Sequence, residues 1–158
     1  MGGALRDLIR LPCLRAVGPA LYDAPMPIAV EYDDRRRWVF ARATGTLTLE
    51  EVLHFIHTAR AGEEHRMWPL LFDASSATTN ATEADVDRAV AAVERVVHNE
   101  GPRGHVALIA DDDELYARML FYEARCAAIG VRTIRAFRQR KDAEQWLEIL
   151  SAARYFTP

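Results

Sequence analysis

The chain has 158 residues, enough for one domain that buries a complete hydrophobic core without a metal ion or a disulfide. Half of the residues are hydrophobic and 27% are charged, which is the composition of an ordinary globular domain. The formal net charge of -3 argues against nucleic acid or an anionic membrane as the partner.

The cysteines and the start of the chain indicate the compartment. Cys13 and Cys126 are too few for a disulfide scaffold, and a reducing environment fits them best. Arg6, Arg10 and Arg15 divide the apolar residues near the start, so we expect no signal peptide. The sequence contains no run of about 20 apolar residues for a membrane span. We therefore expect a cytoplasmic protein.

The first predicted elements follow an N-terminal extension. Residues 1–25 are rich in proline and glycine and have no long period, so we separate them from the domain. Residues 28–32 and 37–43 are predicted to be two strands of a hairpin. Thr48-Leu-Glu-Glu51 is a capping box, and apolar residues at helical spacing follow it. Residues 62–66 are expected to be a loop.

The segment from residue 69 to residue 97 is the most informative. Pro69-Leu-Leu-Phe-Asp-Ala74 predicts a buried strand, residues 75–81 a polar loop, and Thr82-Glu-Ala-Asp85 the start of a helix. Such a connection places backbone N–H groups and hydroxyls at the carboxyl edge of a sheet, where open α/β folds bind ligands. The side chains that we assign to this binding or regulatory loop are Asp73, Ser75, Ser76, Thr79, Asn80, Thr82 and Glu83.

The remaining elements complete an alternating α/β pattern. Residues 105–110 predict a strand covered on both faces, and a helix that starts at four acidic residues, 111–114, ends at Gly130. Residues 131–137 predict a half-exposed strand, and Asp142 is expected to cap the last helix. The order ββαβαβαβα indicates one α/β domain over residues 26–152, with a mostly parallel sheet, an N-terminal hairpin and about four helices. Residues 153–158 form a short tail.

This order resembles the STAS superfamily, in particular the SpoIIAA-like proteins related to bacterial anti-sigma-factor antagonists. The resemblance runs from about residue 26 to residue 150. It rests on the order of elements together with Gly45-Thr-Leu-Thr-Leu-Glu-Glu51, Leu71-Phe-Asp-Ala-Ser75 and Val106-Ala-Leu-Ile-Ala110. It implies a SpoIIAA-like sandwich and a regulatory role through protein contacts.

The resemblance also implies where a regulatory site would lie. In the regulatory members, a strand ending in Asp-Leu-Ser leads to an Asp-Ser-Ser-Gly segment, where a partner kinase phosphorylates a serine. Here Asp73-Ala-Ser75 matches the first part, and Ala81-Thr-Glu-Ala84 stands over the second. Thr82 is the only hydroxyl left there. We therefore expect no switching by serine phosphorylation and interpret Thr82 as a helix N-cap.

Side chains suited to catalysis form no recognisable motif. His54 and His57 lie one turn apart on a helix, and His65 follows, but no further ligand stands at the spacing of a zinc site. Ser75 is not part of a G-x-S-x-G motif. The acidic residues 111–114 suit the positive end of a helix better than a cation site. We predict a protein that is not an enzyme and has no metal and no cofactor.

Two hypotheses for the function remain open. The helix after residue 112 carries Tyr116, Leu120 and Phe121 outside its core stripe, which indicates an interface or an apolar groove. The preferred hypothesis is a non-catalytic STAS-like regulatory or protein-interaction module, with a protein partner or a second copy of itself bound. The alternative is a domain that binds a small molecule or lipid in an apolar pocket between this helix and the sheet.

Overall fold

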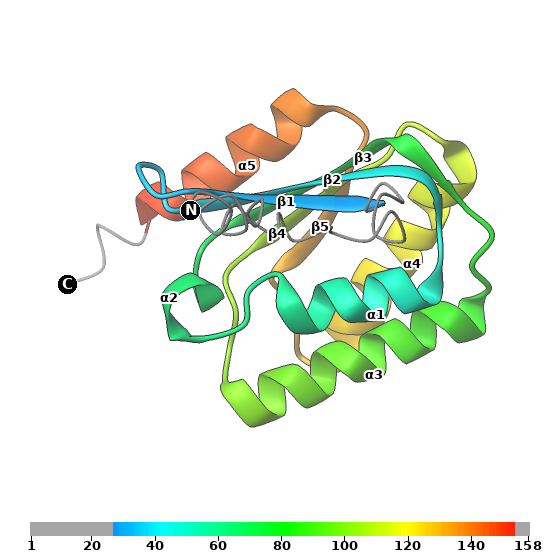
Figure 1. The fold of residues 1–158 in the computed structure, drawn as a ribbon, viewed down its shortest axis with the longest axis horizontal. Helices are drawn as coiled ribbons and strands as arrows, with labels where there is room; N and C mark the ends of the chain where they lie inside the picture. Colours follow the sequence, from blue (N-terminus) through cyan, green and yellow to red (C-terminus); the bar gives the residue numbers. More distant parts are fainter. Residues whose placement is uncertain (1–26, 154–158) are drawn as a thin grey trace, which may run out of the picture.

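The computed structural model describes residues 27–153, and it contains the predicted order of elements with one short additional helix (Figure 1). The strands are β1 (Ile28–Asp33), β2 (Trp38–Leu47), β3 (Leu70–Thr79), β4 (Val106–Ile109) and β5 (Ile134–Phe137). The helices are α1 (Leu49–Thr58), α2 (Glu63–Arg66), α3 (Glu83–Glu100), α4 (Asp113–Ala128) and α5 (Arg140–Ala153). The predicted extension over residues 1–25 lies outside the described residues, as does the predicted tail apart from residue 153.

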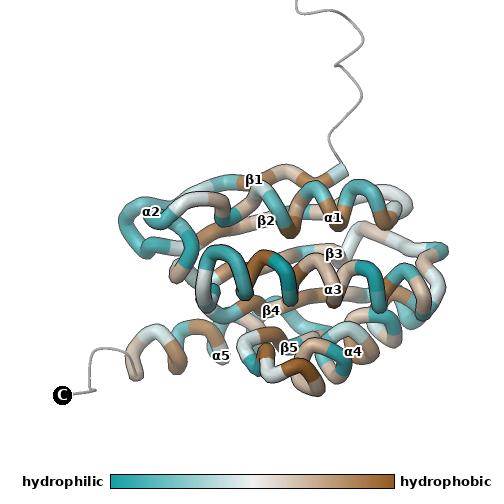
Figure 2. Tube along the Cα trace, turned by 90° about the horizontal axis from the view of Figure 1, so that it is seen from below, coloured by the Kyte–Doolittle hydropathy of each residue, from teal (hydrophilic) through white to brown (hydrophobic). Residues whose placement is uncertain are grey.

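The five strands form one sheet in chain order, β1-β2-β3-β4-β5. β1 pairs antiparallel with β2, and the other pairs are parallel, so the predicted mostly parallel sheet with an N-terminal hairpin is confirmed. Right-handed crossovers that all advance in one direction place their helices on one face of the sheet. α1, α3 and α4 accordingly share a face and lie side by side over the strands (Figure 2). α5 packs on the opposite face (Figure 1).

Alternation along the strands divides the core between the two faces. Leu70 and Phe72 of β3 join the larger cluster under α1, α3 and α4, whereas Leu71 between them joins the cluster under α5. Leu71 and Leu147 of α5 are almost completely buried. The strands at the centre of the sheet are therefore covered on both faces, as the apolar runs predict.

Both predicted capping boxes are present. Thr48 Oγ1 accepts a hydrogen bond from the backbone N–H of Glu51, at 3.3 Å. Thr82 Oγ1 accepts one from Asp85, at 3.2 Å, and the Asp85 carboxylate accepts the Thr82 N–H at 3.0 Å. The interpretation of Thr82 as the N-cap of α3 is confirmed. The last helix begins at Arg140, so Asp142 lies in its first turn and is not its cap.

Two loop predictions are wrong. Residues 63–66 form the single turn α2, and residues 75–79, predicted as polar loop, continue β3. The extra part of β3 pairs with the end of β2, where Thr44, Thr46 and Leu47 lie opposite Ser76, Thr78 and Thr79. Threonine favours strands, and Thr46 and Thr78 bring their hydroxyls to 3.3 Å across the pair. Pairing with β2 therefore stabilises a strand in a segment whose composition suggests a turn.

No helix among the described residues has the length and hydropathy needed to cross a membrane.

Candidate functional site

The predicted binding loop is split between the two faces of the sheet. Asp73 lies on the α5 side, where Arg140 Nη1 approaches its carboxylate at 3.4 Å. The same carboxylate accepts hydrogen bonds from the backbone N–H of Ser75 at 3.0 Å and from its hydroxyl at 2.6 Å. Burial acts to raise the pKa of Asp73, but these two hydrogen bonds and the charges of Arg140 and Arg42 outweigh it and lower the pKa.

Residues 79–83 of that predicted loop lie at the start of α3, whereas Ser76 lies in β3, opposite Thr44 of β2. Ser76 and Asn80 are exposed, and Thr79 accepts a hydrogen bond from the Ala81 N–H at 3.0 Å. Thr82 caps α3, and Glu83 is 3.9 Å from Nη1 of Arg118. The structure therefore brings Asp73 and Ser75 together and places Thr82 and Glu83 apart from them, because α3 and α5 cover opposite faces.

The predicted interface residues of α4 differ in exposure. Tyr116 and Phe121 are half-buried and pack against the larger core cluster. The guanidinium of Arg138 lies 4.1 Å from the centre of the Tyr116 ring. Leu120 is 42% exposed. Of these three residues, Leu120 alone is exposed.

The histidines are distributed without a common centre. His54 and His57 are exposed on α1, and the His65 ring contacts Tyr32 at a tilt and Trp68 edge-on, with ring centres 4.4 and 4.6 Å away. Within residues 27–153, no three histidine, cysteine, aspartate or glutamate side chains gather where they could hold a metal ion.

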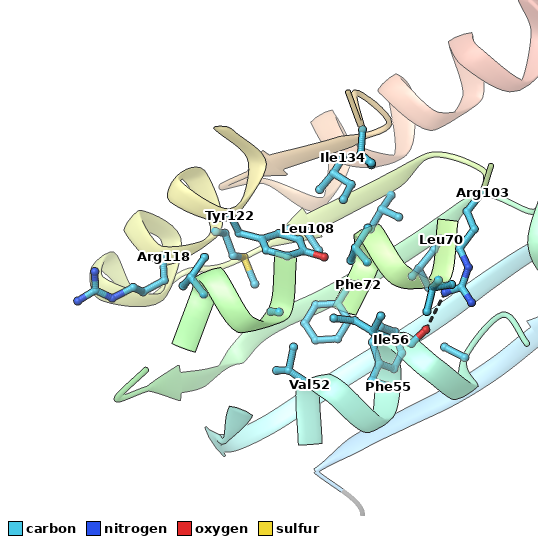
Figure 3. Close-up of a pocket in the computed structure, with 18 of the residues that line it drawn as sticks. Val52, Phe55, Ile56, Leu70, Phe72, Arg103, Leu108, Arg118, Tyr122 and Ile134 are labelled. Atoms are coloured by element: carbon cyan, nitrogen blue, oxygen red, sulfur yellow. Dashed lines mark hydrogen bonds between the residues drawn. The ribbon is translucent and has the colours of Figure 1, made fainter. Parts of the chain in front are cut away.

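A large apolar cavity lies between the sheet and the layer formed by α1, α3 and α4 (Figure 3). Its volume is about 260 Å³. Voids larger than one water molecule are rare in protein interiors, and an engineered apolar cavity of about 150 Å³ already binds benzene. The main apolar side chains on the walls are Val52, Phe55 and Ile56 of α1, Val86, Ala89 and Val93 of α3, Met119 and Tyr122 of α4, and Leu70, Phe72, Leu108 and Ile134 of the sheet.

Arginine side chains stand at both ends of this cavity. Figure 3 shows Arg103 at one end and Arg118 at the other, with the apolar side chains between them. Arg103 donates from Nη1 to the Ile56 carbonyl at 2.7 Å, and its Nη2 pairs with Glu100 at 3.1 Å. Arg60, also on the wall, donates to the carbonyls of Trp68 and Gly104 at 3.1 and 2.7 Å.

Two groups on or beside the α4 wall of the cavity have raised pKa values. Burial raises the pKa of the Tyr122 hydroxyl well above its usual range, and neighbouring Cys126 adds to the effect, against the opposing charges of Arg60 and Arg103. Burial also raises the pKa of the Cys126 thiol to about 11, although a hydrogen bond with Tyr122 acts to lower it. At neutral pH both groups are uncharged.

The sequence predicts an apolar pocket only as the alternative hypothesis, between α4 and the sheet. The cavity also uses α1 and α3, whose wall residues look like ordinary core stripes in the sequence. A weak signal existed in α3, where Val86, Ala89 and Val93 are small for a core face opposite a wide sheet. Their short side chains leave part of the space between the layers unfilled.

Comparisons with known proteins concern the fold. No protein-family model matches the chain, and no curated protein matches it. Among solved structures, the chain is similar to an uncharacterised protein of the DUF3478 family with a SpoIIAA-like fold, from Shewanella loihica PV-4. The TM-score is 0.47 and the identity is 18%, over 76% of this chain and 91% of that chain.

Proposed function

We propose that this domain is a non-catalytic binding protein that encloses an apolar small molecule, or the chain of a lipid, between the sheet and the layer of α1, α3 and α4. The observation that carries the proposal is the apolar cavity of about 260 Å³. Apolar side chains that border an unfilled space lose packing contacts, and a bound apolar molecule would restore those contacts.

The volume indicates the size of the ligand. A water-sized group occupies about 30 Å³, so the cavity has room for about nine such groups. A saturated chain of eight to ten carbons, or a compact two-ring molecule, is of this size. We therefore expect one medium-length apolar chain.

The non-catalytic part of the proposal is supported by the protonation of Tyr122, on the wall, and of Cys126, beside it. Tyr122 and Cys126 both stay protonated at neutral pH because burial raises their pKa values. A catalytic nucleophile or base needs the opposite tuning, towards the working pH.

Filling the cavity tests the proposal. Native mass spectrometry of the freshly purified chain should detect a bound apolar species, and calorimetry should detect binding of decan-1-ol after delipidation. Ala89→Phe places a ring in the cavity and should abolish decan-1-ol binding. Ala84→Phe makes the same substitution on the exposed side of α3 and should leave binding unchanged. The proposal fails if the wild-type chain binds no decan-1-ol, or if both variants bind it equally.

The protein-interaction hypothesis stays a prediction, as does the cytoplasmic location. The exposed Leu120 on α4 is the observation that favours an interface. Size-exclusion chromatography with light scattering tests self-association, where a dimer that Leu120→Glu converts to a monomer would support this surface. A monomeric wild-type chain would contradict the homodimer.

A further inference from the structure

The charged residues on the cavity wall are mostly of one sign. Four arginines, at positions 60, 103, 118 and 132, line the cavity, against one carboxylate, Asp85. Asp85 is already engaged, because it accepts the Thr82 N–H as part of the α3 capping box. An apolar cavity with mostly positive charges on its wall favours a ligand that carries a negative charge at one end.

Arg103 has an unused donor inside the protein. Its side chain is 9% exposed, and two of its nitrogens are occupied by the Ile56 carbonyl and by Glu100. Its Nε–H is buried and has no acceptor among the described residues. A buried N–H without an acceptor costs free energy, so such groups in native proteins call for an explanation. An acceptor carried by the ligand would supply the missing hydrogen bond.

A second guanidinium lies close to the same end of the cavity, because Nη1 of Arg60 donates to the carbonyl of Gly104, the residue after Arg103. The only carboxylate that pairs directly with Arg103 within the described residues is Glu100, whose side chain is 41% exposed. Water weakens that ion pair, and positive charge remains at the cavity end.

The opposite end of the cavity is different. Nε of Arg118 donates to the Ala81 carbonyl at 2.9 Å, and its Nη1 faces Glu83 at 3.9 Å. Its side chain is 30% exposed, so water also reaches it. Arg132 is exposed. Neither leaves a buried donor without a partner, which distinguishes them from Arg103.

We propose that the ligand of the cavity is an amphipathic carboxylic acid whose carboxylate binds Arg103, while its apolar chain fills the space towards Arg118. This inference rests on the proposed function and specifies the ligand class. The carboxylate accepts the Nε–H of Arg103 in a charge-assisted hydrogen bond. The chain lies against Phe55, Phe72 and Met119. A medium-chain fatty acid of eight to ten carbons has both the carboxylate that would bind Arg103 and the apolar chain that would fill the cavity.

The test compares two probes that share a chain and differ in the head group. The delipidated full-length protein is titrated with decanoate and with decan-1-ol at pH 7.5. Decanoate should bind at least about tenfold more tightly, as expected for a hydrogen bond to a charged group. Arg103→Gln should remove this preference and leave decan-1-ol affinity unchanged to within about twofold. Arg118→Gln, at the other end, is the matched control and should keep the preference.

A second measurement avoids dependence on the folding of a variant. In the ¹⁵N-labelled wild-type protein, the Nε–H resonance of Arg103 should shift on addition of decanoate and stay in place with decan-1-ol. Equal affinity of the wild type for both probes would overturn this inference and leave the proposed function standing. Binding of neither probe would overturn both. A preference for decanoate that persists in Arg103→Gln, or an unmoved resonance, would overturn the assignment to Arg103.

Discussion

At the scale of single residues, the buried pair of Cys126 and Tyr122 links the cavity wall to the stability of the fold. The pKa of the Cys126 thiol is about 11 in the folded chain, against an ordinary value of 9.0. Between these two pH values the unfolded chain loses the thiol proton and the folded chain keeps it. The free energy of unfolding therefore falls as the pH rises, and the contribution from Cys126 is complete only below pH 9.

This difference gives a measurable slope. Over two pH units, the loss amounts to about 3 kcal/mol, at roughly 1.4 kcal/mol per unit. Urea unfolding at pH 8 and pH 11 should show this decline in the wild type. Cys126→Ala should lose stability at pH 8 but decline less steeply towards pH 11. Parallel declines in the two proteins would contradict the assignment of the slope to Cys126.

Contacts within one helical turn could be predicted from the sequence. Thr82 and Asp85 stand three positions apart, and their mutual hydrogen bonds need only the first turn of α3. The same holds for Thr48 and Glu51 at α1. The role of Arg103 could not be predicted in this way, because its partner Ile56 lies 47 positions away in the chain.

At the scale of elements, the connection before β4 is held by a close backbone contact. Gly104 donates its N–H to the Arg66 carbonyl at 3.0 Å and accepts a hydrogen bond from Arg60. A Cβ atom at position 104 would lie 2.3 Å from the Met67 carbonyl oxygen. Backbone atoms cannot move aside as a flexible side chain does, so this position requires glycine for steric reasons.

We expect Gly104→Ala to destabilise the domain by about 3 kcal/mol or more, at the upper end of overpacking effects. Gly45→Ala is the matched comparison, because φ there is +70° and a Cβ would meet nothing within 4 Å. That substitution should cost only the strain of a left-handed backbone, about 1–2 kcal/mol. Denaturant unfolding of both variants measures the difference, and an equal cost would show that the close contact relaxes easily.

The extension of β3 shows why element boundaries were harder to predict than element types. Residues 75–79 carry serine and threonine, which suit both turns and exposed strands. The end of β2, which pairs with them, decides between the two. That pairing is a property of two segments about 30 residues apart. Residues 75–79 belong to β3, so the predicted site is not the open loop over residues 75–81 that the composition suggests.

At the scale of the whole molecule, the strand order explains where binding is expected. Ligand crevices at the carboxyl edge of an open α/β sheet form where the strand order reverses. In this sheet the order follows the chain without reversal. The sequence could predict the alternation of elements, but neither this order nor the fit between three helices and the sheet. The cavity depends on that fit, since its wall residues come from separate elements.

A ligand that binds only the folded chain must also raise its stability. At a free concentration of decanoate one hundred times its dissociation constant, the gain is about 2.7 kcal/mol. Thermal unfolding should therefore show a Tm that rises with decanoate concentration. Ala89→Phe should show no such rise, and a Tm that decanoate leaves unchanged in the wild type would contradict specific binding to the native state.

A strand order that follows the chain also affects how the protein folds during its synthesis. During synthesis on the ribosome, β1 and β2 emerge first, and each later strand finds its neighbour already exposed beside it. No gap has to be kept open in the growing sheet for a strand that arrives late. We expect the polypeptide to assemble from its amino end towards its carboxyl end, with α5 closing the second face last.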